Sequence, residues 1–251
     1  MRYKNVAITT IVIILLSLLA IVYLCFSNLS MSFGYKNSWT EQSGSNSEDD
    51  GITVVIDAGH GGIDPGAVAN GLVEKELNLS VAKKLEQFLK LSNVNVVMTR
   101  TEDVLLGDGD TVRAHKAADL RERLSIAEQI DNAVFVSIHM NKFDSEYVHG
   151  LQTFYASSTE GSQELAQSIQ NSVTLLDKDN KREIKPDSGN IYVLENTTRT
   201  AVLVECGFLS NTKEAKLLSD DGYQNSLAFI IYIGIINYIQ ENENENSVCL
   251  R

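Results

Sequence analysis

The chain has 251 residues, of which 43% are hydrophobic and 22% are charged, proportions typical of a globular protein that buries an ordinary core. Its formal net charge of −12 argues against a protein that holds nucleic acid by neutralising phosphates, because that mode of binding needs clustered lysine and arginine. A neutral or mixed-charge substrate fits this composition better. Three cysteines, Cys25, Cys206 and Cys249, stand in unlike contexts and predict no disulfide framework.

The chain opens with a segment typical of a membrane anchor. Arg2 and Lys4 precede an uncharged apolar run over residues 6–26, which at about 20 residues is long enough to cross a bilayer core as a helix. Positive charge on the short N-terminal side keeps that side cytoplasmic and places the rest of the chain on the extracytoplasmic face. A cleaved signal peptide, which would release a secreted protein, and a lipoprotein signal at Cys25 are the alternatives. We expect residues 1–26 to be a cytoplasmic stub and an uncleaved transmembrane helix.

Two further segments lack the periodic apolar positions that would let them pack. Residues 27–50 are rich in serine, asparagine and acidic residues, which is typical of a flexible linker. Residues 241–251 begin with alternating glutamate and asparagine and are expected to form a disordered tail. The sequence therefore predicts one folded domain over residues 51–240.

Within that domain, short apolar runs alternate with amphipathic stretches, the order typical of an α/β fold. The expected strands are short and rich in β-branched residues, as buried parallel strands are, and cover residues 52–56, 94–98, 133–138 and 201–204. The expected helices have apolar residues at helical spacing and cover about residues 77–89, 120–130, 161–176 and 223–240. We expect a single α/β domain with a central, largely parallel sheet flanked by helices on both faces.

Side chains that can bind a metal stand at the ends of these strands. His60 lies in the glycine-rich turn after the first expected strand, and His139 follows the third. Because ligands bind at the carboxyl ends of the strands in an open α/β sheet, two histidines at that edge are a candidate metal pair. Glu74, at the start of the first expected helix, can be the third ligand, since two histidines and a glutamate form a catalytic zinc set that leaves a position for water. The pattern therefore offers a candidate site for one zinc ion (Zn²⁺) per chain.

Glu205 directly follows the last expected strand, at the same edge. A carboxylate in that place is positioned to take a proton from the attacking water and to return it to the leaving amine. Burial next to Cys206 and Phe208 raises the pKa of this carboxyl group, whereas a nearby metal lowers it, and the sequence does not decide between the two effects.

Each candidate also has a structural alternative: a loop residue for His60, a helix-dipole partner for Glu74, a core histidine for His139, and a cap of the next helix for Glu205. The joint placement of all four at one sheet edge favours the metal site. The remaining histidines, His115 and His149, are expected to be solvated loop residues.

The domain carries a series of motifs in a fixed order. They are Asp57-Ala58-Gly59-His60-Gly61-Gly62-Ile63-Asp64-Pro65-Gly66-Ala67, Glu74-Lys75 with Asn78-Leu79, Thr99-Arg100 with Asp103, Arg123 with Ala127, Ser137-Ile138-His139 with Asn141, and Val204-Glu205-Cys206-Gly207-Phe208-Leu209-Ser210-Asn211. Over about residues 54–239 this order resembles the zinc-dependent N-acetylmuramoyl-L-alanine amidase family. The resemblance implies hydrolysis of the amide between the lactyl group of N-acetylmuramic acid and L-alanine in peptidoglycan. It also implies His60, Glu74 and His139 as zinc ligands and Glu205 as the catalytic carboxylate.

Within that family the chain is similar to membrane-anchored members that act in sporulation, where the reaction begins muramic-δ-lactam formation in the spore cortex and hence bears on germination. Lys142 stands where the family often has alanine, which leaves the ligand His139 untouched but changes the rim of the cleft. Residues 143–150 are too few to hold the inhibitory helix of some division-linked relatives. Relatives of this type can depend on an activating partner protein, and no docking site for one is evident in the sequence.

Two other functions remain open at this stage. A zinc peptidase that cuts bonds within wall peptides would use the same metal chemistry. A tethered wall-binding module would hold a structural metal or none, but an intact Glu205 and an open coordination position argue against it.

Overall fold

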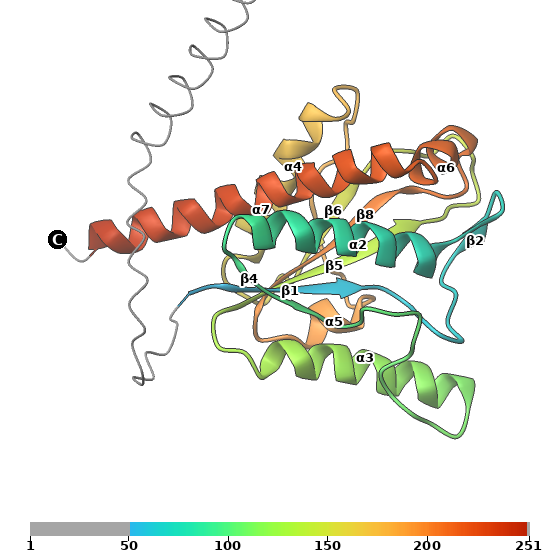
Figure 1. The fold of residues 1–251 in the computed structure, drawn as a ribbon, viewed down its shortest axis with the longest axis horizontal. Helices are drawn as coiled ribbons and strands as arrows, with labels where there is room; N and C mark the ends of the chain where they lie inside the picture. Colours follow the sequence, from blue (N-terminus) through green and yellow to red (C-terminus); the bar gives the residue numbers. More distant parts are fainter. Residues whose placement is uncertain (1–50, 250–251) are drawn as a thin grey trace, which may run out of the picture. The chain divides into compact units, whose positions relative to one another are not determined.

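The computed structural model describes residues 51–249, with side chains described as far as residue 242 (Figure 1). The expected transmembrane helix within residues 1–26 and the expected linker of residues 27–50 lie outside the described residues. Among the helices of residues 51–249, none combines the length and the apolar character that crossing a bilayer requires.

A six-stranded sheet with the order β4-β1-β5-β8-β6-β7 forms the centre of the domain. Its strands are β1 (Thr53–Ala58), β4 (Asn95–Met98), β5 (Ala133–Asn141), β6 (Gln152–Tyr155), β7 (Lys185–Pro186) and β8 (Thr200–Phe208). Strands β4, β1, β5 and β8 run parallel, β6 runs antiparallel to β8, and β7 pairs parallel with β6. The expected, largely parallel sheet is confirmed, and β6 and β7 are additions that the sequence analysis did not predict.

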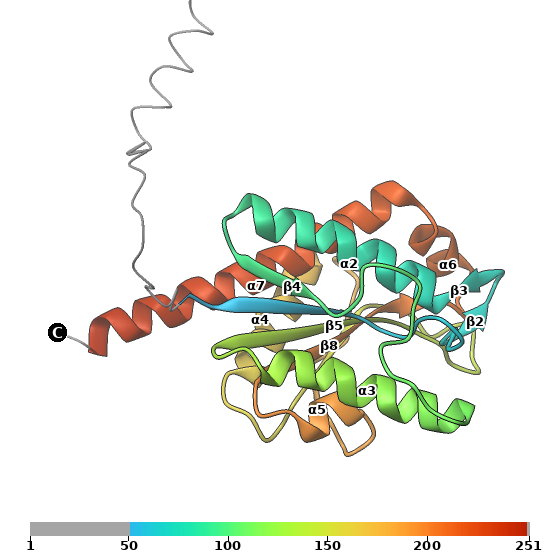
Figure 2. The ribbon, with the colours of Figure 1, turned by 60° about the horizontal axis from the view of Figure 1, so that its bottom comes forward.

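Helices cover both faces of this sheet, as expected (Figures 1 and 2). On one face lie α2 (Glu74–Leu91), α4 (Ser162–Ser172) and α7 (Asp221–Cys249), and on the other α3 (Val112–Glu128) and α5 (Tyr192–Asn196). The remaining elements are the hairpin of β2 (Val68–Ala69) and β3 (Leu72–Val73), the 3-10 turn η1 (Val173–Leu175) and α6 (Thr212–Leu218).

Apolar side chains of alternate strand positions enter two buried clusters, one on each face of the sheet. In β1, Val54 and Ile56 belong to the cluster under α2, α4 and α7, whereas Val55 belongs to the cluster under α3 and α5. Both faces of the central strands are therefore buried, which explains why these strands are continuous apolar runs in the sequence. Full burial of each such side chain stabilises the fold by about 1.5–3 kcal/mol.

Helix α7 is longer than the sequence pattern predicts. It begins at Asp221 and continues to Cys249, through most of residues 241–251, which the sequence analysis expects to be a disordered tail. A helix that is already formed and packed adds each further residue at low cost, and glutamate has a favourable helix propensity. These two effects account for the extension beyond residue 240.

Candidate active site

The carboxyl ends of β1, β5 and β8 carry the chemistry-bearing residues side by side. His139 and Glu205 are register partners in the parallel β5–β8 ladder. In the neighbouring β1–β5 ladder Ala58 pairs with Ile138, so Gly59 and His139 follow a pair of register partners. Paired positions of neighbouring strands direct their side chains to the same face of a sheet. His139 and Glu205 lie inside their strands, not just after them as the apolar runs suggested, because the backbone pairing continues past the last apolar residue.

His60, Glu74 and His139 converge on one point. Their possible ligand atoms all lie within 4.8 Å of one another. His139 Nδ1 is 2.9 Å from Glu74 Oε1, and His60 Nε2 is 3.3 Å from Glu74 Oε2. Two imidazole nitrogens and a buried carboxylate are a donor set that suits a divalent metal such as zinc. The structure thus brings together the three residues that the sequence analysis selected as ligands, from the β1 turn, the start of α2 and β5.

The backbone around this cluster is shaped to leave room for it. A Cβ atom at Gly59 would fall on the imidazole of His139, and one at Gly66 would meet the carboxylate of Glu74. His60 itself has φ +61°, a left-handed conformation that costs about 1–2 kcal/mol for a residue with a side chain. Neighbouring contacts must hold this turn in place.

Charge interactions keep Glu74 ready to bind a cation. Burial raises the pKa of its carboxyl group, but the hydrogen bonds and charges of His139 and His60 outweigh burial and hold that pKa far below its usual range. Burial lowers the pKa of His60, and the hydrogen bonds and negative charges of Glu74 and Asp64 more than reverse this, so its pKa lies above the ordinary value. Asp64 accepts from His60 Nδ1 at 2.9 Å, which leaves Nε2 directed at Glu74.

Glu205 has the environment of a proton-transfer group. Its Oε2 atom is buried and has no hydrogen-bond partner among the residues that the structure describes. Burial raises the pKa of Glu205 to about 7, with His139 and His60 opposing the shift and Glu74 adding to it. A carboxyl group with a pKa near neutrality can both accept and release a proton. The alternative role as a helix cap is wrong, because Asn211 caps α6.

The other residues singled out in the sequence stand outside the cluster. His149 is exposed in the connection between β5 and β6, as expected, whereas His115 lies in helix α3 and not in a loop. Lys142 is exposed, and its Nζ donates to the Val68 carbonyl at 3.2 Å. The described residues between β5 and β6 form no helix, in agreement with the short connection expected there.

A buried polar network beneath the cluster was not predicted. Asp57, at 1% exposure, accepts from Arg123 at 2.6 Å, from Thr99 at 2.7 Å and from Ser137 at 2.6 Å. Arg123 also pairs with Asp119 one turn earlier in α3, at 2.7 Å. The i, i+4 spacing of Asp119 and Arg123 on one helix is the sequence signal that could have indicated this pair.

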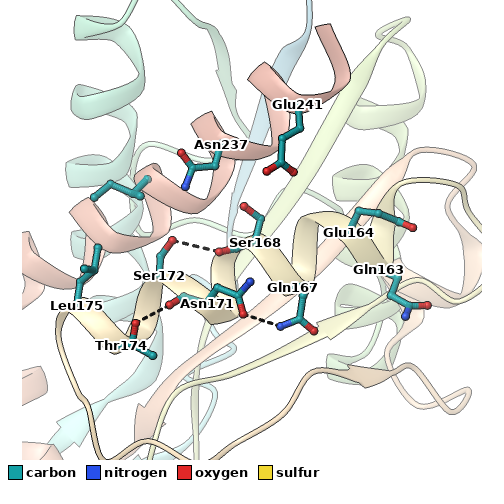
Figure 3. Close-up of a pocket in the computed structure, with 11 residues that line it drawn as sticks. Gln163, Glu164, Gln167, Ser168, Asn171, Ser172, Thr174, Leu175, Asn237 and Glu241 are labelled. Atoms are coloured by element: carbon teal, nitrogen blue, oxygen red, sulfur yellow. Dashed lines mark hydrogen bonds between the residues drawn. The ribbon is translucent and has the colours of Figure 1, made fainter. Parts of the chain in front are cut away.

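A groove of about 550 Å³ lies between α4 and α7 (Figure 3). Its lining is mostly amide and hydroxyl side chains, among them Gln167, which donates to Asn171 at 2.7 Å, and the nearby Asn237. It contains none of the four predicted site residues, so the chemistry belongs to the sheet edge and not to this groove.

Known proteins resemble this chain over nearly all of the folded domain. The profile of the N-acetylmuramoyl-L-alanine amidase family matches residues 54–237. The chain belongs to this family. The resemblance seen in the sequence motifs is thereby confirmed, and the chain is a hydrolase of the N-acetylmuramoyl-L-alanine amidase class.

Relatives of this amidase include proteins of known role. The germination-specific N-acetylmuramoyl-L-alanine amidase of Bacillus subtilis (strain 168) is 36% identical over 193 residues, which cover 76% of this chain and 81% of that protein. The CwlD amidase from Clostridioides difficile, solved in complex with the GerS lipoprotein, is 41% identical with a TM-score of 0.72 over 75% of this chain and 98% of that chain. The catalytic domain of CwlV from Bacillus (Paenibacillus) polymyxa var. colistinus is 36% identical with a TM-score of 0.65, over 75% and 98%.

Proposed function

We propose that this amidase is a zinc enzyme in which His60, Glu74 and His139 hold the metal and Glu205 transfers protons. The observation that carries the proposal is the convergence of the three ligand side chains beside a carboxyl group whose Oε2 atom is buried and unpartnered. The reaction is hydrolysis of the amide between N-acetylmuramic acid and the L-alanine of the stem peptide.

The residues present fit a zinc ion. Glu74 is 3% exposed and is kept ionised between two imidazoles, so the centre of the cluster offers a negatively charged ligand. His60 would bind through Nε2, because its Nδ1 is engaged by Asp64. When bound, zinc supplies Lewis acidity, which acidifies water and polarises the scissile carbonyl.

Glu205 provides the proton transfers that hydrolysis needs. Its Oε2 removes a proton from the attacking water as the new carbon–oxygen bond forms. It then delivers that proton to the nitrogen of L-alanine as the carbon–nitrogen bond breaks, so the stem peptide leaves as a neutral amine. One carboxyl group serves both steps, because its ionised form accepts the proton in the first and its protonated form releases it in the second. Because β8 places Glu205 beside His139, the proton carrier is held next to the site where the carbonyl must lie.

We place this activity outside the cytoplasmic membrane, in spore-cortex peptidoglycan. The similarity to a germination-specific amidase supports a role in forming the muramic-δ-lactam of the cortex. The similarity to an amidase solved with a lipoprotein supports an activating partner of that kind. A membrane tether within residues 1–26 would bring the enzyme to the surface on which a lipoprotein is anchored.

The test uses the full chain in detergent, as wild type, Glu205→Gln and the matched control Glu128→Gln, whose carboxylate binds Thr197 at 2.8 Å, outside the ligand cluster. Zinc content is measured by elemental analysis and digested peptidoglycan by mass spectrometry. We expect one zinc per chain in all three proteins and release of whole stem peptides by wild type and Glu128→Gln only. A general base contributes about 10²- to 10⁴-fold, so Glu205→Gln should lose activity by that factor.

Three other outcomes would each contradict one part of the proposal. Fragments that keep alanine on muramic acid would indicate a peptidase. Wild-type activity in Glu205→Gln would remove Glu205 from the mechanism, and an active wild type free of metal would refute the zinc site.

A further inference from the structure

Buried side chains hold three consecutive carbonyl groups of the turn that carries His60. The Ala58 carbonyl accepts from Arg100 Nε at 2.7 Å and from Arg123 Nη1 at 2.8 Å. The Gly59 carbonyl accepts from Arg100 Nη2 at 3.0 Å, and the His60 carbonyl from Arg123 Nη2 at 2.7 Å. Two guanidinium groups therefore hydrogen-bond to the backbone of the turn that carries the candidate ligand His60.

Arg123 is itself held in place in the interior. Arg123 is 1% exposed, and its Nε and Nη1 atoms are held by Asp119 and Asp57 at 2.7 and 2.6 Å. These carboxylates raise the pKa of Arg123 against the effect of burial, so the group stays charged. Arg123 comes from α3, on the face of the sheet opposite to α2, and so ties the His60 turn to a separate layer of the fold.

Arg100 joins the turn to a second ligand. Its Nη2 atom donates to the Lys75 carbonyl at 2.9 Å as well as to Gly59, and Lys75 is the residue after Glu74. Asn78, one turn further along α2, donates to both the Gly59 carbonyl at 3.1 Å and Glu74 Oε1 at 3.3 Å. The spacing between the His60 turn and the start of α2 is thus set by Arg100 and Asn78, neither of which is a candidate metal ligand.

The His60 turn needs these hydrogen bonds to keep its backbone conformation. His60 has φ +61°, a backbone conformation that a histidine leaves readily when it is not held. A guanidinium presents several N–H donors in a rigid planar fork, so it can hold neighbouring carbonyls at fixed relative positions. A lysine ammonium is a single point on a flexible stem and cannot reproduce that arrangement.

We infer that Arg100 and Arg123 are positioning residues, which hold His60 and the start of α2 in the geometry that binds the metal. The inference rests on the proposed zinc function. Neither arginine is one of the three candidate ligands. Arg123 acts through the His60 carbonyl, and Arg100 acts through the carbonyls of Gly59 and Lys75, the residues next to His60 and Glu74. Outer residues that orient metal ligands typically contribute 10- to 100-fold to metal affinity.

The test compares full-length wild type with Arg100→Lys, Arg123→Lys and the control Arg199→Lys. Arg199 is a part-buried arginine that likewise donates to a backbone carbonyl, that of Glu128 at 2.6 Å. It precedes the amino end of β8, whereas the candidate ligands lie at the carboxyl ends of the strands. Zinc affinity is measured by competition with a chromophoric chelator, ligand geometry by the visible absorption of the cobalt-loaded protein, and folding by circular dichroism and the Tm of metal-free protein.

We expect zinc affinity to fall about 10- to 100-fold in Arg100→Lys and Arg123→Lys, with an altered cobalt spectrum, and to stay at the wild-type value in Arg199→Lys. Arg100→Lys is the decisive variant, because the hydrogen bonds of Arg100 go to carbonyls only and its replacement leaves no buried carboxylate unpaired. Wild-type affinity and spectrum in folded Arg100→Lys would overturn the inference alone. A wild type that binds no zinc would overturn the proposed function and this inference with it.

Discussion

Glu205 lies directly across the β5–β8 ladder from His139, so the backbone pairing of two central strands places a proton-transfer group beside a candidate metal ligand. Both strands are buried on both faces, and the apolar residues that precede this pair, such as Val136 and Val204, are fully buried. A site built on paired central strands has less freedom to move than one built on loops. We therefore expect substitutions next to His139 and Glu205 to lower metal affinity more than they lower the stability of the fold.

Gly59→Ala should sharply reduce zinc binding. The new methyl group would occupy the space of the His139 imidazole, which must turn away from Glu74. We expect zinc affinity to fall by at least about 10-fold, the size seen when the orientation of a ligand is disturbed. Isothermal titration of metal-free protein with zinc measures the effect.

The control for this variant is Gly71→Ala in the β2–β3 hairpin. Unlike Gly59, Gly71 has a left-handed backbone, with φ +75°, and an added Cβ there meets no atom within 4 Å. This variant should lose about 1–2 kcal/mol of stability through backbone strain and keep its zinc affinity. Equal zinc binding by Gly59→Ala and wild type would contradict the predicted position of His139.

The buried ion pair of Asp57 and Arg123 should make stability depend on pH in acid. Burial raises the pKa of Asp57, but Arg123, Ser137 and Thr99 together hold it below the ordinary value. A carboxyl group whose pKa is lower in the folded state stabilises the protein above the unfolded pKa of about 3.9, and this contribution is lost as pH falls through the folded pKa. Asp57→Asn should therefore cost about 3 kcal/mol at pH 7 and progressively less below about pH 4.

Urea unfolding at pH 7 and at successively lower pH measures this difference. Asp103→Asn is the matched control, because Asp103 pairs with Lys75 at 2.6 Å but its side chain is 50% exposed. A surface pair of this kind contributes less than about 1 kcal/mol. A loss in Asp57→Asn that stayed constant as the pH fell would exclude the ion pair as its cause.

Much of the fold could be predicted because it follows local patterns. Strands β1 and β5 are continuous apolar runs, as strands buried on both faces must be, and the amphipathic spacing of α2 is plain. Strand β6 (Gln152–Tyr155) was missed because it is a short segment that begins with two polar residues, Gln152 and Thr153, both buried. Its place in the sheet comes from pairing with β8, a contact between distant parts of the chain.

The candidate site divides in the same way. His60, Glu74 and His139 could be grouped from sequence, because the topology of an α/β sheet brings the carboxyl ends of its strands together. The hydrogen bonds of Arg100 and Arg123 to the His60 turn could not be predicted from sequence. They join residues 41 to 65 positions apart, and their acceptors are backbone carbonyls, which leave no mark in side-chain patterns.

Gly234→Ala should destabilise the packing of α4 against α7. A Cβ at Gly234 would lie 2.5 Å from the Cα of Ile169, and the Gly234 carbonyl accepts from Ser168 at 2.7 Å, so the two helices touch through backbone. Overpacking of such a contact costs about 1–3 kcal/mol. Gly222→Ala in the same helix meets only the flexible Asp220 side chain and should gain up to about 1 kcal/mol from helix propensity. Urea unfolding of both variants checks the opposite signs, and a neutral Gly234→Ala would mean that the helices can separate without loss.

Removal of the metal should lower stability without unfolding the domain. The Glu74 carboxylate lies 2.9 Å from His139 Nδ1 and 3.3 Å from His60 Nε2, so these imidazoles can compensate its charge when the metal is removed. A ligand that binds only the folded state at about 100 times its Kd adds about 2.7 kcal/mol, so chelation should lower the Tm and zinc should restore it. Glu74→Gln removes the negative ligand and should melt at one temperature with or without zinc. Calorimetry of both proteins with and without chelator measures these Tm values. A wild-type Tm that does not change with zinc would contradict a metal held by His60, Glu74 and His139.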